Sequence, residues 1–327
     1  MRLSSLLPKS LSLLAASALL LGAAGARAQA YPDKPIRLVV PFAAGGSTDT
    51  IGRALAVKLQ DLLKQTVVVE NKPGAAGGIG SGYVAQAAPD GYTLLLCTTS
   101  THAVLPHLND KLSYDAQKQF APVALIAKAP NVLMVSPKIP AKSVTELIEL
   151  ARKKPGTLNF ASSGNGTITH LIGEMFAASA NIQAVHVPYK TGVQALPDIT
   201  SGDIAFSFDS ITWALPQDKA GRVRALAVTS PNRSSLAPEL PTVAESGLPG
   251  FEGMTWFGIA APAGTPPAVV EKLSGRIAAA LNSADLKTQL QAQGVEPDYL
   301  GAAAFDAFIR KESAHWGNLI GKLGVKQ

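Results

Sequence analysis

The sequence predicts an α/β protein built from two lobes. After the first 30 residues, short apolar segments of strand character alternate with segments whose apolar residues recur at helical spacing. The alternation starts again near Ala129, which indicates a second lobe. Roughly 300 residues also exceed what one hydrophobic core commonly holds.

The first 30 residues have the composition of a secretory signal. Arg2 and Lys9 precede an apolar stretch over residues 11–24, and small residues follow as far as Ala28-Gln29-Ala30. The apolar stretch is shorter than the ~20 residues that a membrane-spanning helix needs. We therefore predict that residues 1–30 are an export signal rather than an anchor, cleaved after Ala28 or after Ala30.

Charge and cysteine content exclude two other classes of protein. The chain has 29 Lys and Arg against 23 Asp and Glu. Without Arg2, Lys9 and Arg27 the balance is 26 against 23, a net charge of +3 with the basic residues scattered, so no nucleic-acid surface is expected. Cys97 is the one cysteine, which excludes an internal disulfide. Its apolar surroundings predict a small buried side chain.

The first half of the chain has the pattern of a βαβαβ unit. Strands are predicted at 36–40, 67–69 and 92–97, and helices at 49–64 and 79–88. Apolar side chains of the first helix, among them Ile51, Leu55 and Leu59, fall on one face. Such a unit implies a mainly parallel sheet with helices on both faces.

The pattern continues beyond Ala129. Strands are expected at 132–135, 158–161, 184–187, 204–208, 225–229 and 256–261. Helices are expected from the capping box at Ser143 through Arg152, at 167–178 and near Gln194. A connection rich in Pro and Gly covers 238–253, and Thr265-Pro266-Pro267 starts a helical tail that continues from Val269.

Two loops of small residues point to a binding site. Residues 42–48 follow the first strand and open a helix, and residues 160–167 do the same in the second lobe. Open α/β sheets bind ligands at the carboxyl ends of their strands, and helix N-termini offer unpaired amides to anions. A pair of such loops, one in each lobe, predicts a cleft that holds an anion from both sides. Tight backbone turns are the alternative explanation for the glycines.

Motifs of the common enzyme classes are missing. The sequence contains no nucleophile elbow, no H-E-x-x-H and no phosphate loop, and the run from Gly78 to Gly82 lacks the third glycine of a dinucleotide fingerprint. The histidines lack metal-ligand spacing, so we expect no catalytic residue, no metal and no cofactor. His170 is expected to pack near a helix end. Asp209 either accepts a hydrogen bond from a ligand hydroxyl or amine or caps the next helix.

In several of its sequence motifs the chain resembles the Bug (Bordetella uptake gene) or TctC-type receptors of tripartite tricarboxylate transport systems. The likeness covers essentially all of residues 31–327. The motifs that carry it are Tyr31–Ile36, Val40–Phe42 with Gly45–Asp49, Val69–Ala75, Pro89–Leu94, Val187–Lys190, Leu226–Thr229, Pro241–Gly247 and Ala261–Pro266.

The resemblance implies a type II periplasmic binding fold, with two α/β lobes, a hinge that the chain crosses twice and a ligand cleft between the lobes. Lobe 1 would comprise residues 31–128 and 228–327, and lobe 2 residues 129–227. The protein would be a periplasmic, monomeric receptor that captures a small carboxylate and delivers it to membrane transporter subunits. A sensor subunit that presents the ligand to a signalling partner is an alternative, and a secreted carboxylate-processing enzyme is a weaker one.

The predicted binding residues combine both loops with three further positions. We expect Gly46→Val to abolish binding, by blocking close approach of the backbone and by straining a positive φ. The full predicted set is Phe42, Ala44, Gly45, Gly46, Ser47, Thr48, Asp49, Thr99, Ser100, Ser162, Ser163, Gly164, Asn165, Gly166, Thr167 and Asp209.

Overall fold

The computed structural model describes residues 31–292 and 294–324. The predicted signal and its cleavage site therefore lie outside the described residues. Residues Lys34–Gln327 form one compact unit, and all elements discussed below belong to it.

The predicted βαβαβ unit is confirmed. Strand β1 pairs in parallel with β2 on one side and with β3 on the other, so that Leu38 lies opposite both Val69 and Leu94. Leu38, Leu94 and the apolar face of the first helix are buried, which explains why the strands are continuous apolar runs. The elements are β1 (Ile36–Val40), α2 (Ser47–Leu63), β2 (Val67–Asn71), α3 (Gly78–Ala85) and β3 (Thr93–Thr98).

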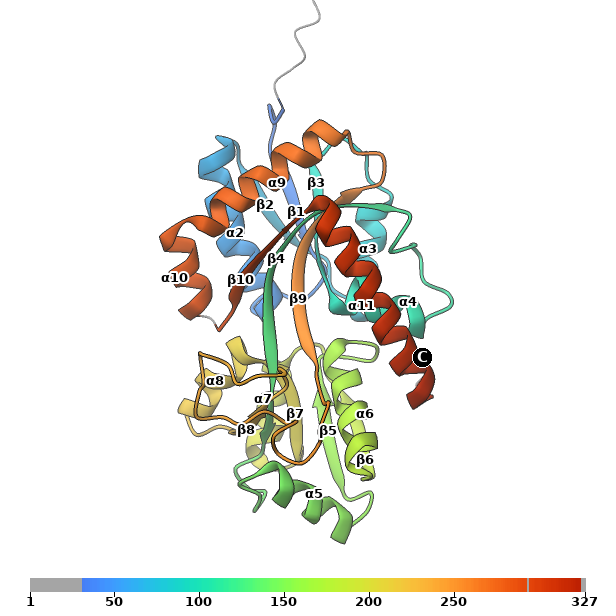
Figure 1. The fold of residues 1–327 in the computed structure, drawn as a ribbon, viewed down its shortest axis with the longest axis vertical. Helices are drawn as coiled ribbons and strands as arrows, with labels where there is room; N and C mark the ends of the chain where they lie inside the picture. Colours follow the sequence, from blue (N-terminus) through green and yellow to red (C-terminus); the bar gives the residue numbers. More distant parts are fainter. Residues whose placement is uncertain (1–30, 293, 325–327) are drawn as a thin grey trace, which may run out of the picture. The chain divides into compact units, whose positions relative to one another are not determined.

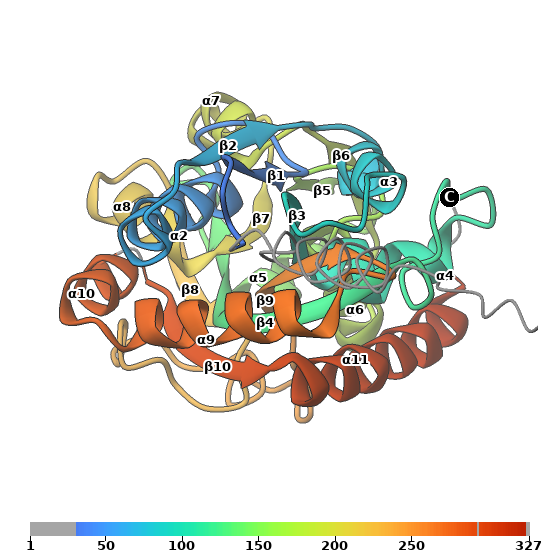
Figure 2. The same cartoon turned by 90° about the horizontal axis from the view of Figure 1, so that it is seen from above.

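Antiparallel strands and three helices complete lobe 1 (Figures 1 and 2). Strand β9 lies between β3 and β4, and β10 pairs with the outer side of β4. The long helix α11 covers this part of the sheet and extends alongside α6 of the other lobe. These elements are β4 (Phe120–Val135), β9 (Met254–Pro262), α9 (Pro267–Asn282), α10 (Ala284–Ala292), β10 (Glu296–Gly301) and α11 (Ala302–Leu323).

Lobe 2 is a second sheet with helices on its faces. Strand β5 pairs in parallel with β6 and β7, and its core holds a cluster of aromatic rings in which Phe176 meets Phe206 and Phe208 edge to face. Its elements are α5 (Val144–Lys153), β5 (Leu158–Ser162), α6 (Ile168–Ala180), β6 (Ala184–Pro188), α7 (Gly192–Ser201), β7 (Phe206–Ser210), α8 (Ile211–Lys219) and β8 (Arg224–Val228).

Strand β4 runs through both lobes. As far as Pro130, which lies opposite Met254, it pairs with β9. From Asn131 onward it pairs with β7 on one side and, from Val132, with β8 on the other. Proline donates no ladder hydrogen bond, so it fits the point where one partner strand ends and another begins. Pro130 and Asn131 therefore mark one crossing between the lobes.

The chain returns to lobe 1 at the start of β9. Before that point Phe251 packs against Phe176 and Phe208, and the N–H of Gly253 donates to the carbonyl of Thr229. These contacts place residues 229–253 against lobe 2. The lobe boundaries expected from the sequence remain a prediction, and we propose to set the second one near Met254 instead of 228.

The sequence-based assignment misses several elements. Strand β4 is far longer than the predicted 132–135, and β10 replaces part of the predicted helical tail, because Pro297 and two acidic residues disguise an edge strand. The helical turns Ser100–Val104 and Leu105–Leu108 are not predicted, and α8 enters the prediction only as the helix that Asp209 could cap. The pairings of β4 and β9 are antiparallel, so the sheet is mixed and not mainly parallel.

Candidate functional site

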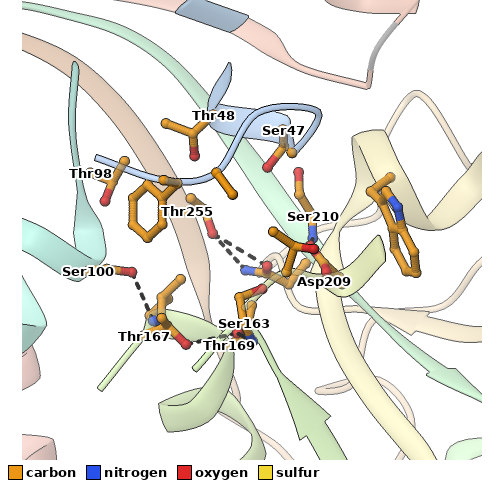
Figure 3. A pocket seen from close by; sticks show the side chains of 18 of the residues that line it. Ser47, Thr48, Thr98, Ser100, Ser163, Thr167, Thr169, Asp209, Ser210 and Thr255 are labelled. Atoms are coloured by element: carbon orange, nitrogen blue, oxygen red, sulfur yellow. Dashed lines mark hydrogen bonds between the residues drawn. The ribbon is translucent and has the colours of Figure 1, made fainter. Parts of the chain in front are cut away.

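Residues of both lobes line one cavity. Five strands, β1, β3, β5, β6 and β7, end at it, and the crossing strands β4 and β9 each add one residue (Figure 3). A concave site with a few polar groups among apolar ones is the usual form of a small-ligand site. The lining residues are Phe42, Ala43, Gly46, Ser47, Thr48, Thr98, Ser100, Asn131, Ser163, Thr167, Ile168, Thr169, Lys190, Thr191, Gly192, Val193, Asp209, Ser210, Trp213 and Thr255.

Four helices begin at this cavity. Their N-cap residues, all of which line it, are Gly46 of α2, Thr167 of α6, Thr191 of α7 and Ser210 of α8. The N-terminus of a helix carries a partial positive charge and amides without intrahelical acceptors. The cavity is therefore arranged to stabilise an anion without a dense cluster of cations.

The four N-termini are not equally available. Side chains cap α6 and α7, where the hydroxyls of Thr167 and Thr191 accept from the amides of His170 and Gln194. Helices α2 and α8 have no side-chain cap. Their first-turn amides, one set from each lobe, are consequently the best placed to donate to a ligand.

The crossing strands contribute two hydrogen-bonded polar side chains to the cavity. The side-chain amide of Asn131 donates to the carbonyl of Gly253 and to the hydroxyl of Thr255, both at 3.1 Å. Asn131 is fully buried, so these bonds offset the cost of removing its amide from water. Thr98, also buried at this edge, has a hydroxyl without a partner among the described residues, which leaves it free for a ligand or water.

Asp209 is the one carboxyl group among the lining residues. One of its oxygens accepts from the backbone N–H of Ser210 at 2.7 Å. The other lies so close to Gly192 that a Cβ atom there would fall 1.9 Å from it. Removal from bulk water raises the pKa of Asp209 to about 7, although the Ser210 hydrogen bond acts in the opposite direction.

Half of the predicted binding residues line this cavity. The loop after β1 contributes from one side and the loop after β5 from the other, and Figure 3 shows Ser47 and Thr48 on α2 opposite Ser163, Thr167 and Thr169. The predicted residues in the lining are Phe42, Gly46, Ser47, Thr48, Ser100, Ser163, Thr167 and Asp209.

Other predicted residues support the first loop from behind. Burial acts to raise the pKa of Asp49, but hydrogen bonds from Arg53, the Gly45 amide and Asn71 outweigh it and lower the pKa. Asp49 is therefore ionised, and its hydrogen bonds hold the first loop in place. Gly45 borders a small neighbouring hollow, and Ala44 lines neither cavity. The hydroxyl of Thr99 accepts from the Trp256 amide, which ties it to β9.

The rest of the second loop faces elsewhere. Gly164 and Asn165 line a larger adjoining cavity, bounded on its other side by Pro73–Gly77. Gly166 donates to Nδ1 of His170 at 3.3 Å, and the hydroxyl of Ser162 lies 2.6 Å from Nε2 of His186. The rings of His170 and His186 stack, so this histidine pair holds both ends of the loop.

The contact of Ser162 with His186 does not have the setting of a catalytic pair. Ser162 is 3% exposed and does not line the cavity, so a substrate has no access to it. Burial, and then the neighbouring His170, lowers the pKa of His186 to about 4, which leaves a weak base. His170 packs near the start of α6 within lobe 2, as expected.

The expected strain at Gly46 is absent. Its φ is −81°, and a Cβ atom there would have only the carbonyl oxygen of Ala43 in its neighbourhood, at 3.7 Å. Positive φ belongs to the preceding residue, Gly45, at +83°. The strain argument for Gly46→Val is therefore wrong, and only occupation of the cavity by the new side chain remains.

Sequence reasoning missed the contributions of α7, α8 and the crossing strands. Thr191 and Ser210 also follow strands and open helices, so the rule that located the first two loops would have located them. Asn131 and Thr255 are polar residues in buried strands, which is a weaker signal. The missed lining residues are Ala43, Thr98, Asn131, Ile168, Thr169, Lys190, Thr191, Gly192, Val193, Ser210, Trp213 and Thr255.

The described part of the chain contains neither a cluster of metal-ligand side chains nor a membrane-spanning helix. Within residues 31–292 and 294–324, no three His, Cys, Asp or Glu side chains lie together as metal ligands. No helix in the same part of the chain is long and apolar enough to cross a membrane.

Two α/β lobes, two crossing strands and a cavity at the strand ends define a solute-binding protein of the periplasmic type. The sequence model of the tripartite tricarboxylate transporter family receptor (TctC) matches residues 51–325. The chain belongs to this family of receptors, in agreement with the resemblance in its motifs.

Known relatives are similar over nearly their whole length. The BugT protein of Bordetella pertussis is 36% identical over 305 residues, which are 93% of this chain and 94% of BugT. A structure from R. palustris solved with adipate has a TM-score of 0.88 and 34% identity, covering 90% of this chain and 99% of that one. MatC from Rhodopseudomonas palustris, with bound malate, has a TM-score of 0.83 and 31% identity, covering 89% and 100%.

Proposed function

We propose that this protein is a periplasmic receptor that captures a small carboxylate between its lobes and delivers it to the membrane subunits of a tripartite transporter. It would act as a monomer, after export and removal of residues 1–30, and would catalyse no reaction. The observation that carries the proposal is the convergence of four helix N-termini on one cavity.

The chemistry of the lining favours a dicarboxylate. The uncapped N-termini of α2 in lobe 1 and of α8 in lobe 2 both open onto the cavity, so a ligand with two carboxylates would use both. Hydroxyls of Ser47, Thr48 and Thr98 add donors around them. Adipate and malate, which occupy two similar structures, are ligands of this class.

A thermal-shift screen tests the proposal. Adipate, malate and citrate are compared with adipamide, malamide and dimethyl adipate, which have similar shape and no charge. A carboxylate at 100 times its dissociation constant should add about 2.7 kcal/mol to the free energy of unfolding. Equal shifts from the neutral compounds, or no shift from any carboxylate, would contradict an anion site.

Two further measurements separate a receptor from an enzyme and from a rigid pocket. Mass spectrometry after long incubation should recover the carboxylate unchanged, and a product would restore the enzyme hypothesis. Small-angle scattering should show a smaller radius of gyration with ligand, because closure brings the two halves of the site together.

A further inference from the structure

We infer that Asp209 takes up a proton when a carboxylate binds and then donates a hydrogen bond to it, so that Asp209 selects anionic carboxylates over ligands with an amine. The inference rests on the proposed function, because it concerns the same cavity. It adds a role for the one acidic group in a site otherwise built to hold anions.

The first step is the position of Asp209 among anion-binding groups. It is the residue before the N-cap of α8, and its second oxygen lies against Gly192, the first residue of α7. A ligand carboxylate that uses either N-terminus therefore comes close to the Asp209 carboxyl. Two carboxylates in contact cannot both remain ionised, so the pair shares one proton.

The second step is the lack of a compensating cation. Among the described residues, Asp209 forms no salt bridge, and the one other titratable side chain in the lining is the exposed Lys190, two residues before α7. Its carboxyl accepts a single hydrogen bond, from the backbone of Ser210. An ionised Asp209 beside a bound anion would thus be poorly stabilised.

Several charged groups on the neighbouring elements are engaged elsewhere, and Lys219 lies exposed at the far end of α8. On α2, Asp49 pairs with Arg53. On α7, Asp198 accepts from the Tyr189 hydroxyl, and on α8, Asp218 accepts from the amide of Ala225. On the lobe 1 half of β4, Lys128 pairs with Asp298. None of these interactions involves Asp209, so its own proton is the means by which it accommodates a carboxylate. The raised pKa in the free protein is consistent with this role.

The third step concerns the chemistry of selection. A protonated carboxyl donates one hydrogen bond to a carboxylate oxygen, and no covalent bond changes. The proton comes from solvent. An ammonium group on the ligand would instead require an ionised Asp209. An ionised carboxylate has no proton to donate, so the hydrogen bond to the ligand carboxylate would be lost. The geometry therefore points to simple or hydroxylated dicarboxylates.

Isothermal titration calorimetry with adipate and malate tests the inference between pH 6 and pH 9. The wild type, Asp209→Asn and Asp203→Asn are compared, since Asp203 is an exposed acid of the same lobe. Each titration is run in phosphate and in Tris, whose ionisation heats differ. Wild type and Asp203→Asn should lose roughly tenfold in affinity per pH unit above 7 and take up about one proton at pH 8 to 9.

Asp209→Asn keeps a donor at the same place without a titratable proton. It should bind with an affinity that does not change between pH 6 and 9 and with no proton uptake, and circular dichroism confirms its fold. Wild-type binding independent of pH would overturn the inference and leave the proposed function intact. The inference would also be overturned if the wild type bound aspartate more tightly than malate and Asp209→Asn lost this preference. Absence of binding of any carboxylate at any pH would overturn both.

Discussion

The hydroxyl of Ser100 accepts a hydrogen bond from the backbone N–H of Ile168 at 3.0 Å. Ser100 follows β3 in lobe 1, and Ile168 is the first residue of α6 in lobe 2. Both residues line the cavity. The bond therefore joins the two lobes at the edge of the site, and it consumes one of the amides that α6 would otherwise offer to a ligand.

Ser100→Ala should favour the open cleft. A hydrogen bond of this kind contributes about 0.5–1.5 kcal/mol, so its loss should raise the radius of gyration of the free protein and weaken ligand binding by roughly 2- to 12-fold. Small-angle scattering and calorimetry measure the two effects. Ser113→Ala, at an exposed serine, should change neither. Unchanged scattering for Ser100→Ala would show that this bond does not bias the hinge.

The two glycines of the first loop should respond to substitution in opposite ways. Gly45→Ala forces a side chain into φ +83° and should cost about 1 to 2 kcal/mol of free energy of unfolding, measured by urea denaturation. Gly46 has φ −81°, so Gly46→Val should fold normally but lose ligand binding, because its methyl groups enter the cavity. If Gly46→Val folds and binds the ligand with wild-type affinity, the N-terminus of α2 is not part of the binding site.

Acid should destabilise the protein through His186. Its pKa is lowered to about 4, mainly by burial, with His170 adding to the effect and Glu174 opposing it. In the unfolded chain the value is near 6.5, so between pH 6.5 and 4 the unfolded state binds more protons and stability falls as the pH falls. After allowance for partial exposure, the loss should be about 1 to 2 kcal/mol.

Urea denaturation from pH 7 to pH 4 measures this loss. His186→Gln keeps a polar group near Ser162 without titrating, so its stability should change less with pH. His315→Gln, at an exposed position, should keep the wild-type slope. Identical slopes for His186→Gln and the wild type would assign the acid sensitivity to another group, such as the buried His102, whose pKa burial lowers to about 3.

The parts of the fold that the sequence predicts are those dictated by local pattern. The βαβαβ unit follows from apolar strands and an amphipathic helix, and the cap of α5 is formed as expected, with the Ser143 hydroxyl accepting from the Glu146 amide. The full length of strand β4 is not predicted, because Pro122, Lys128 and Pro130 interrupt its run of apolar residues. It persists because the prolines fall at a register shift and at the crossing between lobes, which only tertiary structure reveals.

The same division holds for the cavity. Loops after β1 and β5 are conspicuous because their small residues stand between a strand and a helix. Asn131 and Thr255 reach the site where β4 and β9 cross between the lobes, and their side chains form a hydrogen bond between residues 124 positions apart. Asp49 shows the converse, because an acidic residue in a predicted binding loop has its carboxyl committed to Arg53 and Asn71 behind the loop.

The last prediction separates backbone recognition from ion pairing. Lys190 lines the cavity but is exposed, and Arg222, which contacts Gln217, does not line it. An exposed ion pair contributes about 0.2–1 kcal/mol, so Lys190→Ala should weaken carboxylate binding by no more than about fivefold, with less effect at high salt. Arg222→Ala should leave the affinity unchanged, whereas Gly46→Val should abolish binding. Calorimetric titration of the three variants, after circular dichroism confirms their folds, decides between the two modes of recognition. If Lys190→Ala loses more affinity than Gly46→Val, a salt bridge holds the carboxylate, and the helix N-termini are not its main binding groups.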